Sequence, residues 1–132
     1  MTIYALSSGP GTAGISVIRV SGTATQKIIY EITKKDPPEP RVATRRKFNK
    51  IKENELIDEG ILIWFPAPNS YTGEDMAEFH VHGSKAVIEA INLSLSKIEG
   101  RALVYQKILL ESEMVEKLKL LQLLKKSFKN DV

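Results

Sequence analysis

The alternation of hydrophobic and polar positions divides the first hundred residues into predicted strands and helices. Alternation with a period of two predicts strands, and apolar residues three or four positions apart predict helices. The predicted strands cover residues 2–8, 15–20, 41–52, 61–65 and 76–82. One helix is expected from Ser21 to about Thr33, and a second between Gly83-Ser84 and Gly100. This order predicts an α/β (α+β) domain in which a mixed β-sheet is covered by helices.

Three details of this pattern make sharper predictions. Residues 41–52 are basic and alternate with smaller side chains, which is typical of an exposed or edge strand. The continuous apolar run Ile61–Phe65 is typical of a central strand covered on both faces. Ser21 is a plausible N-cap for the first helix, because its hydroxyl can accept a hydrogen bond from a free backbone N–H.

The last 32 residues have a different character. Glycine and proline are absent after Gly100, and leucine, lysine and glutamate dominate. Apolar positions line one side of a possible long amphipathic helix: Ile108, Val115, Leu118, Leu121 and Leu124. We therefore expect a folded domain over residues 1–100 and a divergent helical tail over residues 101–132.

The composition is that of a globular protein. Of 132 residues, 42% are hydrophobic and 27% charged, and no apolar run approaches the length of a membrane span. The first residues also lack the pattern of a secretory signal, so a cytoplasmic protein is expected. The absence of cysteine excludes disulfides, thiolate catalysis and cysteine-bound zinc. A net charge of +3 permits an anionic partner without indicating one.

Two short motifs suggest chemistry that their context does not support. Gly9–Gly14 fits the dinucleotide fingerprint G-x-G-x-x-G, but that site needs a helix directly after the last glycine. Strand-forming residues follow here, so a tight turn is expected. His80 and His82 share one face of a strand and could ligate a metal, but no third ligand is evident nearby. Hydrogen bonding or packing is the favoured interpretation of both histidines.

Arg19 and Glu78 are charges within otherwise apolar strands. They could point outward at the sheet edge, satisfy each other, or hold a ligand, because unpaired burial of a charge is costly. A carboxylate suits the N–H donors of a pterin ring, and a guanidinium suits the carboxylates of a glutamyl tail. The basic residues of 41–52 are countered by nearby acidic side chains, so direct RNA binding is not expected.

A longer motif carries a specific resemblance. Residues 64–75 read W-F-P-A-P-N-S-Y-T-G-E-D, and E-x-x-x-H-G follows over residues 78–83. With the opening segment 3–22, this stretch resembles the N-terminal domain of the tRNA wobble-uridine modification GTPase family (MnmE/TrmE). The resemblance covers about residues 1–100.

The resemblance implies a fold similar to the tetrahydrofolate-binding domains of the glycine-cleavage T-protein type. It implies that the domain binds a 5-formyltetrahydrofolate-type cofactor and forms a homodimer. The whole enzyme of that family works with a flavin-dependent partner (MnmG/GidA) on carbon 5 of the tRNA wobble uridine. By position, Arg19 and Glu78 correspond to folate contacts, and Lys117 is the best match for a third. We expect a bound folate to hold Arg19 and Glu78 in place, and not a direct contact between these two side chains.

The chain also departs from the family pattern. A P-G-E-F-T segment expected after Gly100 is absent, as are a phosphate-binding loop and the family's C-terminal catalytic cysteine. We therefore expect no GTP turnover or tRNA modification by this chain alone, and only indirect contact with tRNA. A truncated or frame-shifted gene would explain the tail. The alternatives are an interaction module that dimerises without a cofactor and a remnant without function.

Overall fold

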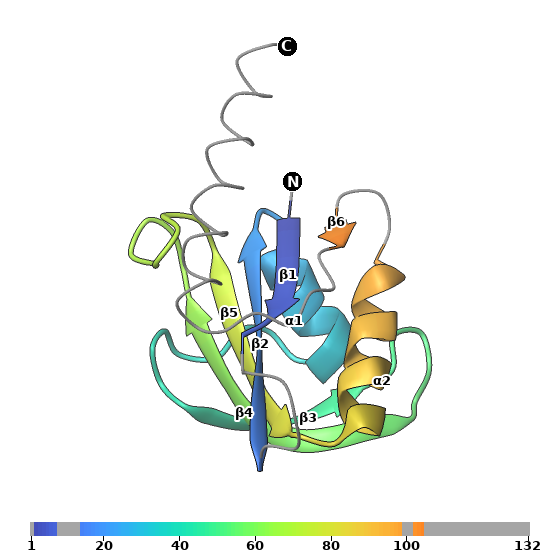
Figure 1. The fold of residues 1–132 in the computed structure, drawn as a ribbon. Coiled ribbons are helices and arrows are strands. Elements are labelled where there is room, and N and C mark those ends of the chain that lie inside the picture. The colour runs from blue at the N-terminus through green and yellow to red at the C-terminus, as the bar shows by residue number, and fades with distance from the viewer. Residues whose placement is uncertain (1, 8–13, 99–101, 105–132) are drawn as a thin grey trace.

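The computed structural model describes residues 2–7 and 14–98 and the backbone of residues 102–104. Within these residues, six strands and two helices follow one another as β1, β2, α1, β3, β4, β5, α2 and β6 (Figure 1). The strands are Thr2–Leu6, Ile15–Gly22, Thr44–Asn49, Leu56–Phe65, Met76–His82 and Ala102–Val104, and the helices are Thr25–Thr33 and Lys85–Ser96. The predicted fold class, a mixed sheet covered by helices, is confirmed. The likeness to T-protein domains stays a prediction.

All six strands belong to one sheet, in the order β3-β4-β5-β2-β1-β6. Neighbours are antiparallel except β1 and β6, which are parallel. The basic strand β3 lies at one edge, as its pattern predicts. At the other edge, residues 102–104 form β6, although they fall in the segment that was expected to be helical. Residues 105–132 lie outside the described part of the chain.

One hydrophobic core joins the sheet to both helices, which cover the same face (Figure 1). Leu62, Phe79 and Ile18 sit opposite one another across β4, β5 and β2 and are fully buried. The fully buried helix residues Ile28, Ile29, Ile32, Ile91 and Leu95 belong to the same core. Alternate residues of the strands point to the opposite face, and on β2 and β5 these include Arg19 and Glu78.

Two local expectations are wrong, while the expected opening of the second helix at Gly83-Ser84 is confirmed, since α2 begins at Lys85. In β4, Leu62 and Trp64 are buried while Ile61 and Ile63 are only half-buried, so this strand is not fully covered on both faces. Ser21 belongs to β2, and α1 begins at Thr25 without a side-chain cap. Ser84 does cap α2, where its hydroxyl accepts a hydrogen bond from the Val87 N–H at 3.2 Å.

No helix in the part of the chain that the structure describes is both long and apolar enough to cross a membrane.

Gly60 marks a close approach between β4 and the neighbouring strands. A Cβ atom at this position would lie 2.0 Å from the backbone oxygen of His80 and 3.0 Å from Cε2 of Phe48. The first contact is with the backbone of a paired strand, which cannot move aside as a flexible side chain would. The sheet therefore requires glycine here.

We predict that Gly60→Ala destabilises the fold, because the added methyl group must displace β5 or distort β4. The expected loss is about 1–3 kcal/mol in the free energy of unfolding, measured by urea denaturation. Gly14→Ala is the matched control, since a Cβ there meets nothing within 4 Å. Equal stability of the two variants would contradict the close approach.

Candidate functional site

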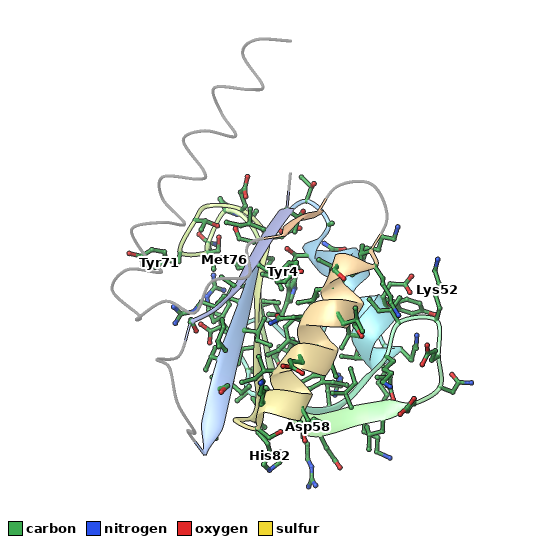
Figure 2. All side chains as sticks on the ribbon, turned by 45° about the vertical axis from the view of Figure 1, so that its right-hand side comes forward. Tyr4, Lys52, Asp58, Tyr71, Met76 and His82 are labelled. Carbon is green, nitrogen blue, oxygen red and sulfur yellow. The ribbon has the colours of Figure 1, made fainter. Side chains whose placement is uncertain are left out.

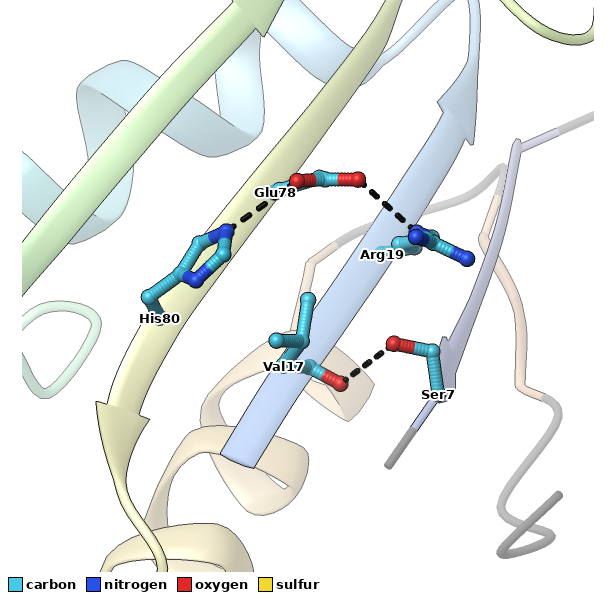
Figure 3. A network of polar contacts seen from close by, with 5 residues as sticks. All are labelled: Ser7, Val17, Arg19, Glu78 and His80. Carbon is cyan, nitrogen blue, oxygen red and sulfur yellow. Dashed lines mark hydrogen bonds and ion pairs between the residues drawn. The ribbon is translucent and has the colours of Figure 1, made fainter. Parts of the chain in front are cut away.

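Arg19 and Glu78 lie directly opposite each other on the central strands β2 and β5. Both side chains point to the face of the sheet away from the helices, since the alternate residues Ile18 and Phe79 enter the core. Nε of Arg19 lies 2.9 Å from Oε2 of Glu78 (Figure 3). The antiparallel register thus places a guanidinium and a carboxylate in contact across 59 residues of sequence.

This ion pair is partly shielded from solvent. The side chains of Arg19 and Glu78 are only 18% and 17% exposed. Ile63 is opposite Glu78 on one side, and Ala5 is opposite Arg19 on the other. Of the alternatives that the sequence left open, an outward position at a sheet edge is wrong. The two groups satisfy each other, which corrects the expectation that they would be held by a folate and not by the partner side chain. Their role toward a folate stays a prediction.

His80 completes a chain of three polar side chains. Its Nε2 lies 3.0 Å from Oε1 of Glu78, so the two carboxylate oxygens contact two different residues (Figure 3). The hydrogen bond with His80, together with the hydrogen bond and charge of Arg19, outweighs the effect of burial and lowers the pKa of Glu78 below its ordinary value. The site therefore presents an ionised carboxylate held from two sides.

His82 has a different partner. Its backbone N–H and its ring Nδ1 each lie 2.8 Å from an oxygen of Asp58, at the end of the sheet near the start of α2 (Figure 2). Burial raises the pKa of Asp58, but the hydrogen bonds of His82, a backbone hydrogen bond of Glu59 and the charge of His82 together outweigh it and lower the pKa overall. The two histidines are thus bound by separate carboxylates, as the hydrogen-bonding interpretation predicted. Among the described residues, no group of three or more His, Cys, Asp or Glu side chains could hold a metal.

The loop of residues 69–75 is the second part of the connection from β4 to β5, and it contacts the end of β2. Oγ of Ser21 lies 2.7 Å from Oγ1 of Thr72, and the Gly22 N–H donates to the Asp75 carbonyl at 2.9 Å. Oγ1 of Thr25 donates to the same carbonyl at 3.0 Å. Sequence reasoning missed Ser21 and Thr72 as partners, because they are 51 residues apart and no local pattern links them.

Lys117, the glycine-rich turn and the basic segment are the remaining features predicted from the sequence. Lys117 and the turn residues 8–13 lie outside the described residues. A strand, β2, follows Gly14, so the helix that a dinucleotide loop requires is not there. In the basic segment, Arg45 pairs with Glu59 at 2.8 Å and Lys50 with Glu55 at 3.0 Å, so acidic side chains do counter these charges.

The lowered pKa of Glu78 predicts a pH dependence of stability. Its unfolded-state value is near 4.5, so the ionised carboxylate stabilises the fold above that pH. This contribution is lost as the pH falls through the lower folded-state pKa. We expect Glu78→Gln to lose less free energy of unfolding than the wild type between about pH 6 and pH 3, measured by urea denaturation. The control for removing one carboxylate is Glu89→Gln, on the exposed surface of α2. Parallel curves for wild type and Glu78→Gln would contradict the assignment.

Most of the chain is similar in sequence to known proteins. The family model described as GTP-binding protein TrmE N-terminus matches residues 2–106. The tRNA modification GTPase MnmE of Pelagibacter ubique is 65% identical over 100 residues, which are 76% of this chain and 23% of that protein. The mitochondrial 5-taurinomethyluridine-[tRNA] synthase subunit GTPB3 of Danio rerio is 46% identical over 99 residues, 75% of this chain and 20% of the relative.

The mitochondrial tRNA modification GTPase gtpbp3 of Dictyostelium discoideum is also 46% identical, over 105 residues. The chain therefore spans between a fifth and a quarter of the length of these relatives. The segment that carries the Arg19–Glu78 pair and the loop of residues 69–75 lies wholly within the matched family region. The chain belongs to the family of TrmE (MnmE) N-terminal domains of tRNA modification GTPases.

Proposed function

We propose that this domain binds a 5-formyltetrahydrofolate-type cofactor at the Arg19–Glu78 pair and forms a homodimer that serves tRNA wobble-uridine modification. Family membership supports the general role, since the printed names of the relatives describe tRNA modification. The observation that carries the cofactor proposal is the Arg19–Glu78 pair itself. It places a guanidinium and an ionised carboxylate side by side on a partly shielded sheet face.

The chemistry of these groups fits a folate. The Glu78 carboxylate can accept N–H donors of a pterin ring, and the Arg19 guanidinium can donate to a glutamyl carboxylate. The half-buried apolar side chains of Ile63 and Phe65, on the neighbouring strand β4, offer a surface for a flat ring on the same face. A bound formyl folate would supply a one-carbon unit. The residues described here would bind and orient it.

Binding at this pair involves an exchange of partners. Each carboxylate oxygen of Glu78 already contacts a donor, Arg19 or His80. A pterin N–H would share or replace one of these donors, so the ligand meets a carboxylate that is already ionised and oriented. Such preorganisation lowers the cost of ordering the site during binding.

The other parts of the proposal follow from family membership. Lys117 is the proposed third folate contact. The proposed partners are a second copy of the chain and the flavin-dependent subunit MnmG/GidA, with tRNA reached only indirectly. The cytoplasm is the proposed location. Because the sequence contains no phosphate-binding loop, GTP turnover is not assigned to this chain.

Calorimetric titration with 5-formyltetrahydrofolate tests the cofactor proposal. We expect Arg19→Ala and Glu78→Ala each to weaken binding by about 1.5–3 kcal/mol, because each removes a charge-assisted contact. Arg45→Ala is the matched control, since it also removes an ion-paired arginine, but one whose side chain is 77% exposed on β3. Circular dichroism at the titration temperature checks that each variant is folded. Wild-type affinity in both site variants would refute the assignment.

Sedimentation equilibrium of the full chain tests dimerisation independently of the cofactor. We expect a mass twice the 14.8 kDa of the single chain, with and without the folate. A dimer that binds no folate would favour the interaction module without a cofactor. The single-chain mass at every protein concentration would overturn the homodimer.

A further inference from the structure

The loop of residues 69–75 is attached to β2 and α1 at its end. The Asp75 carbonyl accepts hydrogen bonds from the Gly22 N–H at 2.9 Å and from Oγ1 of Thr25 at 3.0 Å. The Asp75 carboxylate accepts from the Ala67 N–H at 2.8 Å, which closes the base of the loop. These contacts fix the position at which the chain enters β5.

A second attachment holds the middle of the loop. Oγ of Ser21 and Oγ1 of Thr72 lie 2.7 Å apart, and the two residues are only 1% and 5% exposed. A buried hydroxyl without a hydrogen bond is unfavourable, so the two groups stabilise each other's burial. Oγ of Ser21 also lies 3.5 Å from Oε2 of Glu74, which extends the contact along the loop.

This attachment lies next to the proposed cofactor site. Ser21 is two residues beyond Arg19 on β2, and its partner in the register, Met76, is two residues before Glu78 on β5. Residues two apart on a strand share a face and are about 7 Å apart. The Ser21–Thr72 contact therefore lies two residues along the strands from the ion pair, on the same face of the sheet.

We propose that the hydroxyl pair Ser21–Thr72 is a positioning contact that holds the loop of residues 69–75 as one wall of the cofactor site. This inference rests on the proposed folate binding. Neither hydroxyl is assigned a direct contact with the ligand. Loss of the pair removes a contact between the middle of the loop and β2 while Asp75 stays attached, so the wall becomes more mobile and Arg19 and Glu78 remain in place.

The first test compares folate affinity by calorimetry in the full chain. Thr72→Val keeps the side-chain shape but removes the hydroxyl, and with it the Ser21 contact and a long 3.4 Å bond from the Glu74 N–H within the loop. We expect affinity to fall about three- to tenfold. Thr72→Ser restores the hydroxyl and should restore most of the affinity. Thr44→Val is the control, because its hydroxyl donates to the exposed Val42 carbonyl near the start of β3 rather than to the loop. Equal affinity in wild type and Thr72→Val would overturn the positioning role.

The second test uses hydrogen exchange of the protein without ligand. We expect Thr72→Val to speed exchange of the amides of residues 70–74 at least several-fold, and Thr44→Val to leave them unchanged. Unchanged exchange in Thr72→Val would overturn the attachment itself. If the wild type bound no folate but its loop loosened in Thr72→Val, the cofactor proposal would fall and the attachment would stand. The two failures are therefore distinguishable.

Discussion

The ion pair between Arg19 and Glu78 is the constraint on which the rest of the sheet depends. Each charge lies near the middle of a six-stranded sheet and is less than a fifth exposed. A shift of one residue in the β2–β5 register would send the charges of one strand into the core and bring its core residues out. Ile18 and Phe79, the neighbours of the pair in the chain, are fully buried. The core and the pair therefore specify the same register from opposite faces.

The same constraint supports the polar ligand that we propose for this face. Folding has already brought the charges out of bulk water, and the hydrogen bonds of His80 and Arg19 hold Glu78 ionised. A ligand that binds here exchanges hydrogen-bond partners with an existing pair, and no isolated charge has to be buried for it. An apolar rim on β4, formed by Ile61 and Ile63, is left half-buried because the helices cover only the other face.

Local patterns predicted most of the elements, because strand alternation and the opening of a helix at Gly83-Ser84 depend on residues close in sequence. They failed where the partner is distant. Ser21 looked like a helix cap, but its hydroxyl contacts Thr72, 51 residues away. An apolar run such as that of β4 does not reveal what covers its second face. For Arg19 the sequence left three alternatives, and only the strand register selects among them, since it places Glu78 directly opposite.

The β2–β5 pair is a rigid platform because it is tied at both ends. At one end the Asp75 carbonyl accepts from the Gly22 N–H at 2.9 Å, and at the other the Gly83 N–H donates to the Gly14 carbonyl at 3.3 Å. Seven registered residue pairs lie between these ties. Side chains on such paired strands keep their relative positions better than side chains on loops. The loop beside the ion pair lacks this support, so its geometry depends on contacts within the loop and with β2. The proposed site would combine a fixed floor with a separately anchored wall.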